Sequence, residues 1–151
     1  MPSDSSPPPS VLVLEDDARR IRRMTELFEL AQTGLTILFE RRADTFLKRF
    51  DVAQLRLAAL SLDHDLISPE GNESKESDPG DGRDVTRRLR MYPPVCPVLI
   101  HSTNKPAAAT MKQDLKDGGW KTRSVVPYGD LDWIPELWLP TILRMIASAT
   151  N

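Results

Sequence analysis

Histidine exchanges a proton near neutral pH, and this chain contains only two histidines. His64 lies in Asp63-His64-Asp65, directly after the apolar run 57–62, and His101 follows the apolar run 98–100. Two imidazoles at neighbouring strand ends would suit an acid/base pair acting on a phosphodiester, or the ligation of a transition metal. The alternative is that either ring only makes structural hydrogen bonds, and the residue types alone leave this open.

Acidic residues accompany both histidines. Glu15, Asp16 and Asp17 follow the apolar run 11–14, and Asp63 and Asp65 flank His64. These five carboxylates cannot all stay ionised side by side without compensation. A hard divalent cation with oxygen ligands is the simplest compensation, so we expect Mg²⁺ or Mn²⁺. The alternative is a solvated rim of acids with no metal.

The residues after the second histidine suit a phosphate group. Ser102 and Thr103 offer hydroxyls, Asn104 an amide and Lys105 a cation. These groups could bind the oxygens of a phosphate-containing small molecule or nucleotide. Ser102 and Thr103 could equally cap the helix that follows.

The elements that position these groups alternate between strand and helix. We expect strands over 11–14, 35–39, 57–62, 98–101 and 124–126, and helices from Asp17 to Gly34 and over 43–55, 82–92, 107–115 and 133–149. This alternation predicts an α/β fold, a single five-stranded parallel sheet that is doubly wound in the flavodoxin-like order 2-1-3-4-5. The first, third and fourth strands are then neighbours, which would bring the three polar clusters into one pocket.

Two details of the helices are also expected. In the first helix Arg19, Arg20, Arg22 and Arg23 should face water. In the last, Pro140 should cause a kink or a break.

Length and composition limit the function classes. The 151 residues suit one domain, expected over 11–149 after a Pro/Ser-rich, disordered lead-in over 1–10. The net charge of −2 provides no basic field for general nucleic-acid binding, and Cys96, the single cysteine, excludes an internal disulfide. No stretch is long and apolar enough for a membrane span, and no secretory signal is seen, so we expect a cytoplasmic location. The polar loop 67–81 is long enough to act as a lid.

These motifs resemble the receiver domain of bacterial response regulators, over about 11–149. Val11 to Asp17 is similar to the family's first strand and acidic pair, Leu60 to Asp63 to its phosphoacceptor strand, and 81–89 to its third-helix start. The resemblance implies Asp16 as main Mg²⁺ ligand with Glu15 assisting, and Asp63 as phosphoacceptor. It further implies a metal-binding carbonyl at Asp65, a phosphoryl contact at Ser102, and a histidine kinase or downstream protein as partner.

One receiver feature is missing, and a narrower resemblance accounts for what remains. Receivers place a lysine after the fifth strand, whereas this chain has 126–129, Val-Pro-Tyr-Gly. The segments 63–65 and 101–104 resemble the cyclic-phosphate processing receiver family, which implies action on cyclic phosphates such as 2′,3′-cyclic RNA ends or related nucleotides.

Three hypotheses follow. The first is a metal-dependent phosphoesterase, a cyclic phosphodiesterase, with His64 and His101 as general base and acid, Asp16 and Asp63 on the metal with Asp65 assisting, and Ser102 and Asn104 orienting the phosphate. The second is a two-component signalling receiver phosphorylated on Asp63. The third is a degenerate receiver that acts by binding a partner. A homodimer is compatible with each.

Overall fold

The strands of the computed structural model, which describes residues 8–66 and 78–150, form one parallel sheet. The strand order is β2-β1-β3-β4-β5, which confirms the predicted order. The strands are β1 (Ser10–Leu14), β2 (Thr36–Glu40), β3 (Leu57–Leu62), β4 (Val98–His101) and β5 (Thr122–Val125). In this order the ends of β1, β3 and β4 lie side by side.

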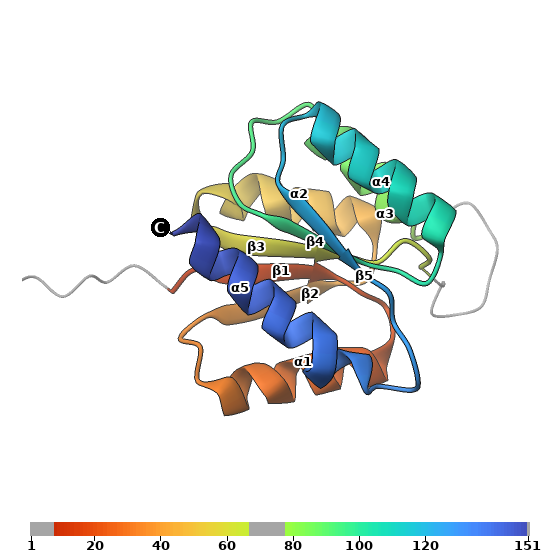
Figure 1. Ribbon diagram of the computed structural model, residues 1–151. Coiled ribbons are helices and arrows are strands. Elements are labelled where there is room, and N and C mark those ends of the chain that lie inside the picture. Colours follow the sequence, from red (N-terminus) through yellow and green to blue (C-terminus); the bar gives the residue numbers. More distant parts are fainter. Residues whose placement is uncertain (1–7, 67–77, 151) are drawn as a thin grey trace, which may run out of the picture.

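Helices cover both faces of the sheet (Figure 1). They are α1 (Ala18–Ala31), α2 (Ala43–Ala53), α3 (Gly82–Leu89), α4 (Lys105–Asp117) and α5 (Leu139–Ala149), with short turns η1 (Gln54–Arg56) and η3 (Ile134–Trp138). Side chains alternate across β1, so Leu12 and Leu14 pack toward α2, α3 and α4, and Val11 and Val13 pack toward α1 and α5. No helix in the described part of the chain is long and apolar enough to cross a membrane.

Several element boundaries differ from the sequence-based expectation. β1 already begins at Ser10, inside the segment expected to be disordered, and residues 1–7 lie outside the described residues. α1 ends at Ala31 because Gln32, and not only Gly34, takes a left-handed conformation (φ 49°). Most of the predicted lid, 67–77, also lies outside the described residues.

The elements toward the carboxyl terminus shift as well. α4 starts at Lys105 instead of residue 107 because the Asn104 side chain caps it, accepting from the Ala107 N–H at 3.1 Å. β5 covers Thr122–Val125 and so starts two residues earlier than expected.

The last helix has the expected break, just before Pro140. The Leu139 N–H donates to the Ile134 carbonyl five residues back, which makes η3 a wide π-helical turn. Pro140 has no N–H to donate, so a regular α-helical bond at that position is unavailable. The wide turn leaves both Trp133 and Trp138 fully buried.

Gly82 fixes the loop after β3 against the start of α3. Its N–H donates to the His64 carbonyl at 2.9 Å. A Cβ at this position would lie 2.2 Å from the Asp63 carbonyl oxygen and 2.9 Å from the His64 Cα. Only a glycine lets α3 approach the strand end that carries Asp63 and His64.

We therefore expect Gly82→Ala to lower the free energy of unfolding by about 2 kcal/mol or more, since it overpacks against backbone. The measurement is urea denaturation. Gly34→Ala is the control: its Cβ would meet no atom within 4 Å, so only the left-handed backbone (φ +73°) resists it, at about 1 kcal/mol. Equal losses in the two variants would contradict the steric argument.

Candidate metal centre and adjoining cavity

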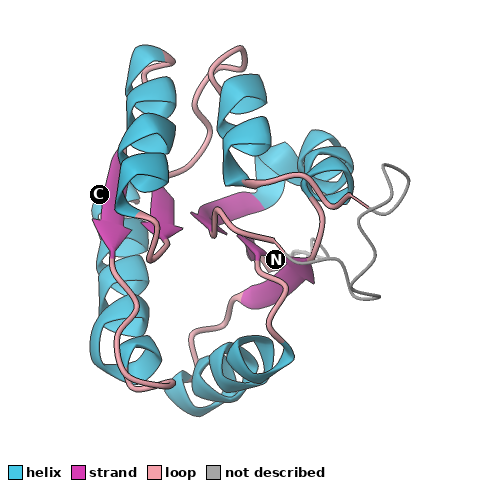
Figure 2. Cartoon of the chain, turned by 90° about the vertical axis from the view of Figure 1, so that its right-hand side faces the viewer, coloured by secondary structure: helices cyan, strands magenta, loops and turns pink. Residues whose placement is uncertain are grey.

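Three buried side chains converge where β1, β3 and β4 end. Glu15, Asp63 and His101 each offer one ligand atom, and these atoms lie within 4.8 Å of one another. Glu15 and His101 are fully buried, and Asp63 is 6% exposed. Figure 2 looks onto this edge of the sheet, with helices on either side. The chain thus brings together three of the residues singled out from the sequence.

His101 is held by a chain of hydrogen bonds that runs from β3 to β4 on the face of the sheet that α5 covers. The Trp138 indole N–H donates to the Ser61 Oγ at 2.9 Å, and Ser61 Oγ lies 2.7 Å from His101 Nδ1. His101 Nε2 lies 3.1 Å from Glu15 Oε1. The Trp133 ring stacks on the imidazole, with centroids 5.8 Å apart. Both ring nitrogens of His101 therefore have partners, and its orientation is fixed from three sides.

Arg20 reaches into this cluster, although the sequence pattern predicted that it would face water. Its Nη1 lies 3.4 Å from Glu15 Oε1 and 3.7 Å from Asp63 Oδ2, and its side chain is 23% exposed. The guanidinium carbon lies 5.2 Å from the Trp133 ring centroid. The prediction for Arg20 was wrong because two buried carboxylates attract a cation more strongly than helix periodicity directs it to solvent.

The two carboxyls respond differently to burial. Burial raises the pKa of Asp63 to about 6; the Glu15 charge adds to this, while His101, the His64 N–H and Arg20 act in the opposite direction. For Glu15 burial also pushes upward, but the hydrogen bond and charge of His101, with Arg20, outweigh it and lower its pKa. Glu15 is therefore the ionised member of the pair, and Asp63 holds its proton into the weakly acidic range.

The other acids near β1 support the cluster from outside it. The backbone N–H groups of Asp16 and Asp17 donate to Glu15 Oε2 at 3.0 and 3.1 Å. The Asp17 side chain caps α1, as expected, by accepting from the N–H groups of Arg19 and Arg20. Among the described residues, the carboxylate of Asp16 is not in the converging group.

His64 points elsewhere. Its Nδ1 lies 2.8 Å from Asp65 Oδ1, and its Nε2 lies 3.6 Å from Asp81 Oδ2. Its backbone N–H donates to Asp63 Oδ1 at 2.7 Å, so only the main chain of His64 joins the buried cluster. Within the described residues the two imidazoles share no partner. Asp65 is largely exposed and contacts His64, not the converging group.

The His64 ring borders a cavity of about 410 Å³ between α3 and α4. It is lined by His64, Asp81, Arg83, Arg87, Asn104, Pro106, Ala107 and Thr110. Arg83 Nε lies 3.5 Å from Asp114 Oδ2, whereas no ion pair is seen for Arg87 among the residues described. The cavity thus combines a histidine, two guanidinium groups and the amino end of α4.

The phosphate-binding candidates after β4 separate into two groups. Ser102 is 2% exposed and its Oγ accepts from the Asn104 N–H at 3.0 Å. The Asn104 amide lies at the cavity, 3.5 Å from Asp65 Oδ1. Thr103 and Lys105 are exposed. Neither of these two lines the cavity.

Sequence reasoning missed four residues that shape the cluster: Arg20, Ser61, Trp133 and Trp138. Ser61 had a usable signal, since it is the one hydroxyl inside the apolar run 57–62. The tryptophans had none, because their contact with β3 and β4 depends on how α5 folds back over the sheet.

The donor set suits a divalent metal ion. Two carboxylates and one imidazole form a mixed oxygen and nitrogen set, and imidazole favours Mn²⁺ or a related transition metal over Mg²⁺. Glu15 and Asp63 would hold such an ion with His101. Arg20 now lies against the same carboxylates, so it supplies the positive charge that an ion would otherwise bring.

Comparison with known proteins agrees with this architecture. The family model described as "Cyclic-phosphate processing Receiver domain" matches residues 11–117, which confirms the resemblance predicted from the sequence. No protein matches in a search of curated sequences.

Solved structures of receiver domains share the fold. The response regulatory domain of mrkE from Klebsiella pneumoniae is 11% identical (TM-score 0.63; 92% of this chain and 96% of that chain). The Mn²⁺-bound response regulator Rcp1 is 16% identical (TM-score 0.63; 89% and 96%). The isolated REC domain of RcsB from Salmonella enterica serovar Typhimurium, with the phosphomimetic BeF₃⁻, is 15% identical (TM-score 0.57; 87% and 86%).

The raised pKa of Asp63 predicts a pH-dependent stability in metal-free protein. A carboxyl whose folded pKa lies above its ordinary value of 3.8 stabilises the fold below about pH 4, and this contribution is lost as the pH rises through 6. Asp63→Asn cannot ionise. Its stability relative to the wild type should therefore rise by up to about 3 kcal/mol between pH 4 and 7.

Urea denaturation in EDTA at both pH values gives the measurement. The exposed Asp132→Asn is the matched control, and its difference from the wild type should stay constant. A constant difference for Asp63→Asn as well would show that burial does not hold the proton on Asp63.

Proposed function

Because the chain belongs to the cyclic-phosphate processing receiver family, we propose that it binds a divalent metal ion at Glu15, Asp63 and His101 and hydrolyses a cyclic phosphoester bound beside His64. The convergence of two carboxylates and an imidazole at the strand ends carries this proposal. An ordinary phosphoacceptor site needs no buried histidine there.

A bound ion would polarise the phosphoryl oxygens and assist a water nucleophile. The chain's own contribution begins with His101. Its Nδ1 lies next to Ser61. The Ser61 hydroxyl oxygen accepts a hydrogen bond from the Trp138 indole and can accept a second one from an Nδ1–H group of His101. A proton placed on Nδ1 leaves the Nε2 lone pair facing Glu15 and free to ligate a metal. Such outer partners commonly fix the tautomer of a metal-binding histidine.

His64 is the candidate general acid or base. When the Nδ1–H group donates its hydrogen bond to Asp65, Nε2 can exchange a proton on the cavity side, as in the orienting pairs of other hydrolytic sites. Asp81 at 3.6 Å from Nε2 would stabilise the protonated ring. The ring of His64 contacts Asp65 and Asp81, neither of which is a proposed metal ligand. His64 would therefore transfer protons, whereas His101 would bind the metal ion.

The cavity between α3 and α4 would hold the phosphate-containing substrate. Arg87 and Arg83 supply cations, Asn104 supplies an amide at the amino end of α4, and Thr110 supplies a hydroxyl further along that helix. A cavity of about 410 Å³ has the size of a small-molecule site. Nucleoside 2′,3′-cyclic phosphates are therefore the first substrates to test.

A second candidate function is phosphorylation of Asp63 in two-component signalling. It is favoured by the position of Asp63 at the end of β3 in a receiver fold and by Arg20, a cation 3.7 Å from its carboxylate. Arg20 would then take the part of the lysine that is missing after β5. A histidine kinase would be the donor and a downstream protein the target.

Metal binding should depend on the geometric cluster. We expect Glu15→Gln and His101→Gln to weaken Mn²⁺ binding about tenfold or more, because each removes a ligand. Asp16→Asn removes a neighbouring carboxylate outside the converging group and is the matched control. Calorimetric titration with Mn²⁺, after circular dichroism has established folding, gives the affinities. A large loss in Asp16→Asn with none in His101→Gln would refute this ligand set.

Arg20→Gln should have the opposite effect. Removing a guanidinium that lies against both carboxylates should tighten Mn²⁺ binding, because the ion no longer displaces a fixed positive charge. The same titration measures it. Unchanged or weaker binding would mean that Arg20 does not compete with the ion.

Turnover is tested with 2′,3′- and 3′,5′-cyclic nucleotides and Mn²⁺, with products separated by chromatography. His64→Ala should lower kcat about 100-fold or more if it transfers a proton, and Arg88→Ala, an exposed substitution on α3 outside the cavity, should not. Absence of turnover by metal-loaded wild type across the panel would reject hydrolysis.

The signalling function is tested separately with acetyl phosphate and Mg²⁺. The wild type should gain one phosphoryl group, and Asp63→Ala should not, only if the signalling function holds.

A further inference from the structure

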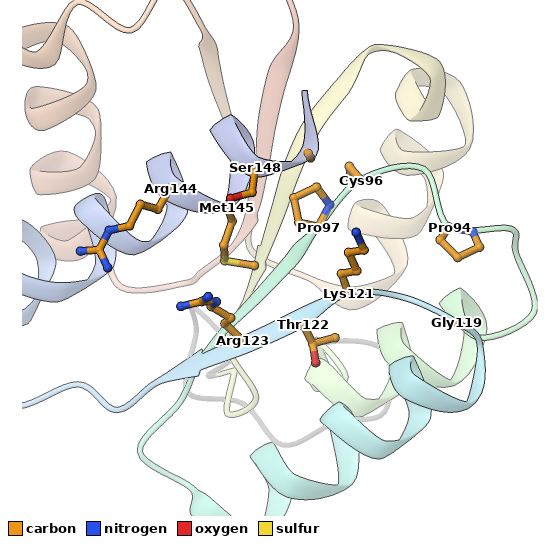
Figure 3. A pocket seen from close by; sticks show the side chains of 11 residues that line it. Pro94, Cys96, Pro97, Gly119, Lys121, Thr122, Arg123, Arg144, Met145 and Ser148 are labelled. Carbon is orange, nitrogen blue, oxygen red and sulfur yellow. The ribbon is translucent and has the colours of Figure 1, made fainter. Parts of the chain in front are cut away.

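A second cavity lies at the opposite end of the sheet from the metal cluster (Figure 3). It is bounded by the segment leading into β4, the start of β5 and the last turns of α5, and has a volume of about 410 Å³. Its lining is Pro94, Cys96, Pro97, Gly119, Lys121, Thr122, Arg123, Arg144, Met145, Ser148 and Ala149. None of these residues takes part in the proposed chemistry.

The charge of this cavity is one-sided. Lys121, Arg123 and Arg144 line it, and no acid does. Among the residues that the structure describes, none of the three cations has a side-chain ion pair or hydrogen bond. The chain as a whole carries a net charge of −2, so a cavity lined by three unpaired cations and no acid is much more positive than the rest of the protein.

The arrangement of the cations follows from the strand. Side chains alternate along β5, so Lys121 and Arg123 lie on the side that faces α5, and Figure 3 shows Arg123 near Met145 and Lys121 near Pro97. Arg144 extends from α5 at the rim of the cavity, away from Lys121. All three cations are exposed to solvent, so the positive charge lies at the open side of the cavity, while its buried wall includes Pro97 and Met145.

The rest of the lining is apolar or uncharged. Pro97 and Met145 are buried, and burial raises the pKa of the Cys96 thiol to about 12, so Cys96 stays uncharged at neutral pH. Apolar walls with a few polar groups that fix orientation are typical of small-molecule sites. The carboxyl end of α5, at Ala149, brings partial negative charge of its own, which the cations more than offset.

We propose that this cavity binds a nucleoside monophosphate, its phosphate contacting Arg123 and Lys121 and the flat face of its heteroaromatic base packing against Pro97 and Met145. Guanidinium groups suit phosphate because they donate two parallel hydrogen bonds. The site is independent of the metal cluster, so a nucleotide bound here would be an effector or a second ligand and not the substrate beside His64.

Calorimetric titration of the full chain with AMP tests the site, with adenosine and inorganic phosphate as partial ligands. AMP should bind about tenfold or more tightly than adenosine. Arg123→Ala and Lys121→Ala should each weaken AMP binding by a similar factor. Arg22→Ala, an exposed substitution on α1 with the same change in net charge, should leave it unaltered.

Amide chemical shifts separate this site from the catalytic cavity. AMP should shift the amides of Thr122, Arg123 and Ser148, and Glu15→Gln and His64→Ala should leave its affinity unchanged. Shifts confined to residues around His64, or an affinity equal in Arg123→Ala and wild type, would overturn the proposal. Neither result depends on whether the chain hydrolyses cyclic phosphates.

Discussion

The neutralisation of two carboxylates at the end of the sheet constrains the rest of this structure. Glu15 and Asp63 lie on neighbouring strands with almost no access to water, where an uncompensated charge would cost several kcal/mol. The imidazole of His101 and the guanidinium of Arg20 lie against these carboxyl groups, and burial raises the pKa of Asp63 to about 6. Arg20 and His101 must themselves be held in place. Asp17 caps the start of α1, which carries Arg20, and Trp133 stacks on the His101 ring.

Two layers of residues therefore surround the cluster. Ser61 contacts His101 on the β3 side and is itself held by the Trp138 indole, and Trp133 covers both His101 and Arg20. The polar chain from indole to carboxylate passes through the apolar core between the sheet and α5, so packing and electrostatics depend on the same side chains. On the other face of the sheet, Gly82 lets α3 approach the loop after β3, where the His64 ring borders the cavity between α3 and α4.

The sequence predicted the fold well, because apolar runs and helical periodicity are local signals and right-handed crossovers leave few topologies. It also identified Glu15, Asp63 and His101, since polar residues at the ends of buried strands are visible in the chain itself. It misplaced Arg20, because nothing in the sequence distinguishes Arg20 from the three neighbouring arginines of α1 until its carboxylate partners are known. It could not separate His64 from His101, since the direction of a side chain after a strand depends on the loop conformation, here fixed by a contact with α3.

The wide turn η3 determines which way the last helix faces. Trp133 and Trp138 are five residues apart, and in a regular α-helix they would point about 140° apart, so that one would leave the core. A π-helical turn is equivalent to one residue inserted into an α-helix. Both indoles can therefore line the same wall, and the length of this segment, as much as its composition, determines the surroundings of His101. A relative lacking one residue between the two positions would have to recruit a different side chain to cover that imidazole.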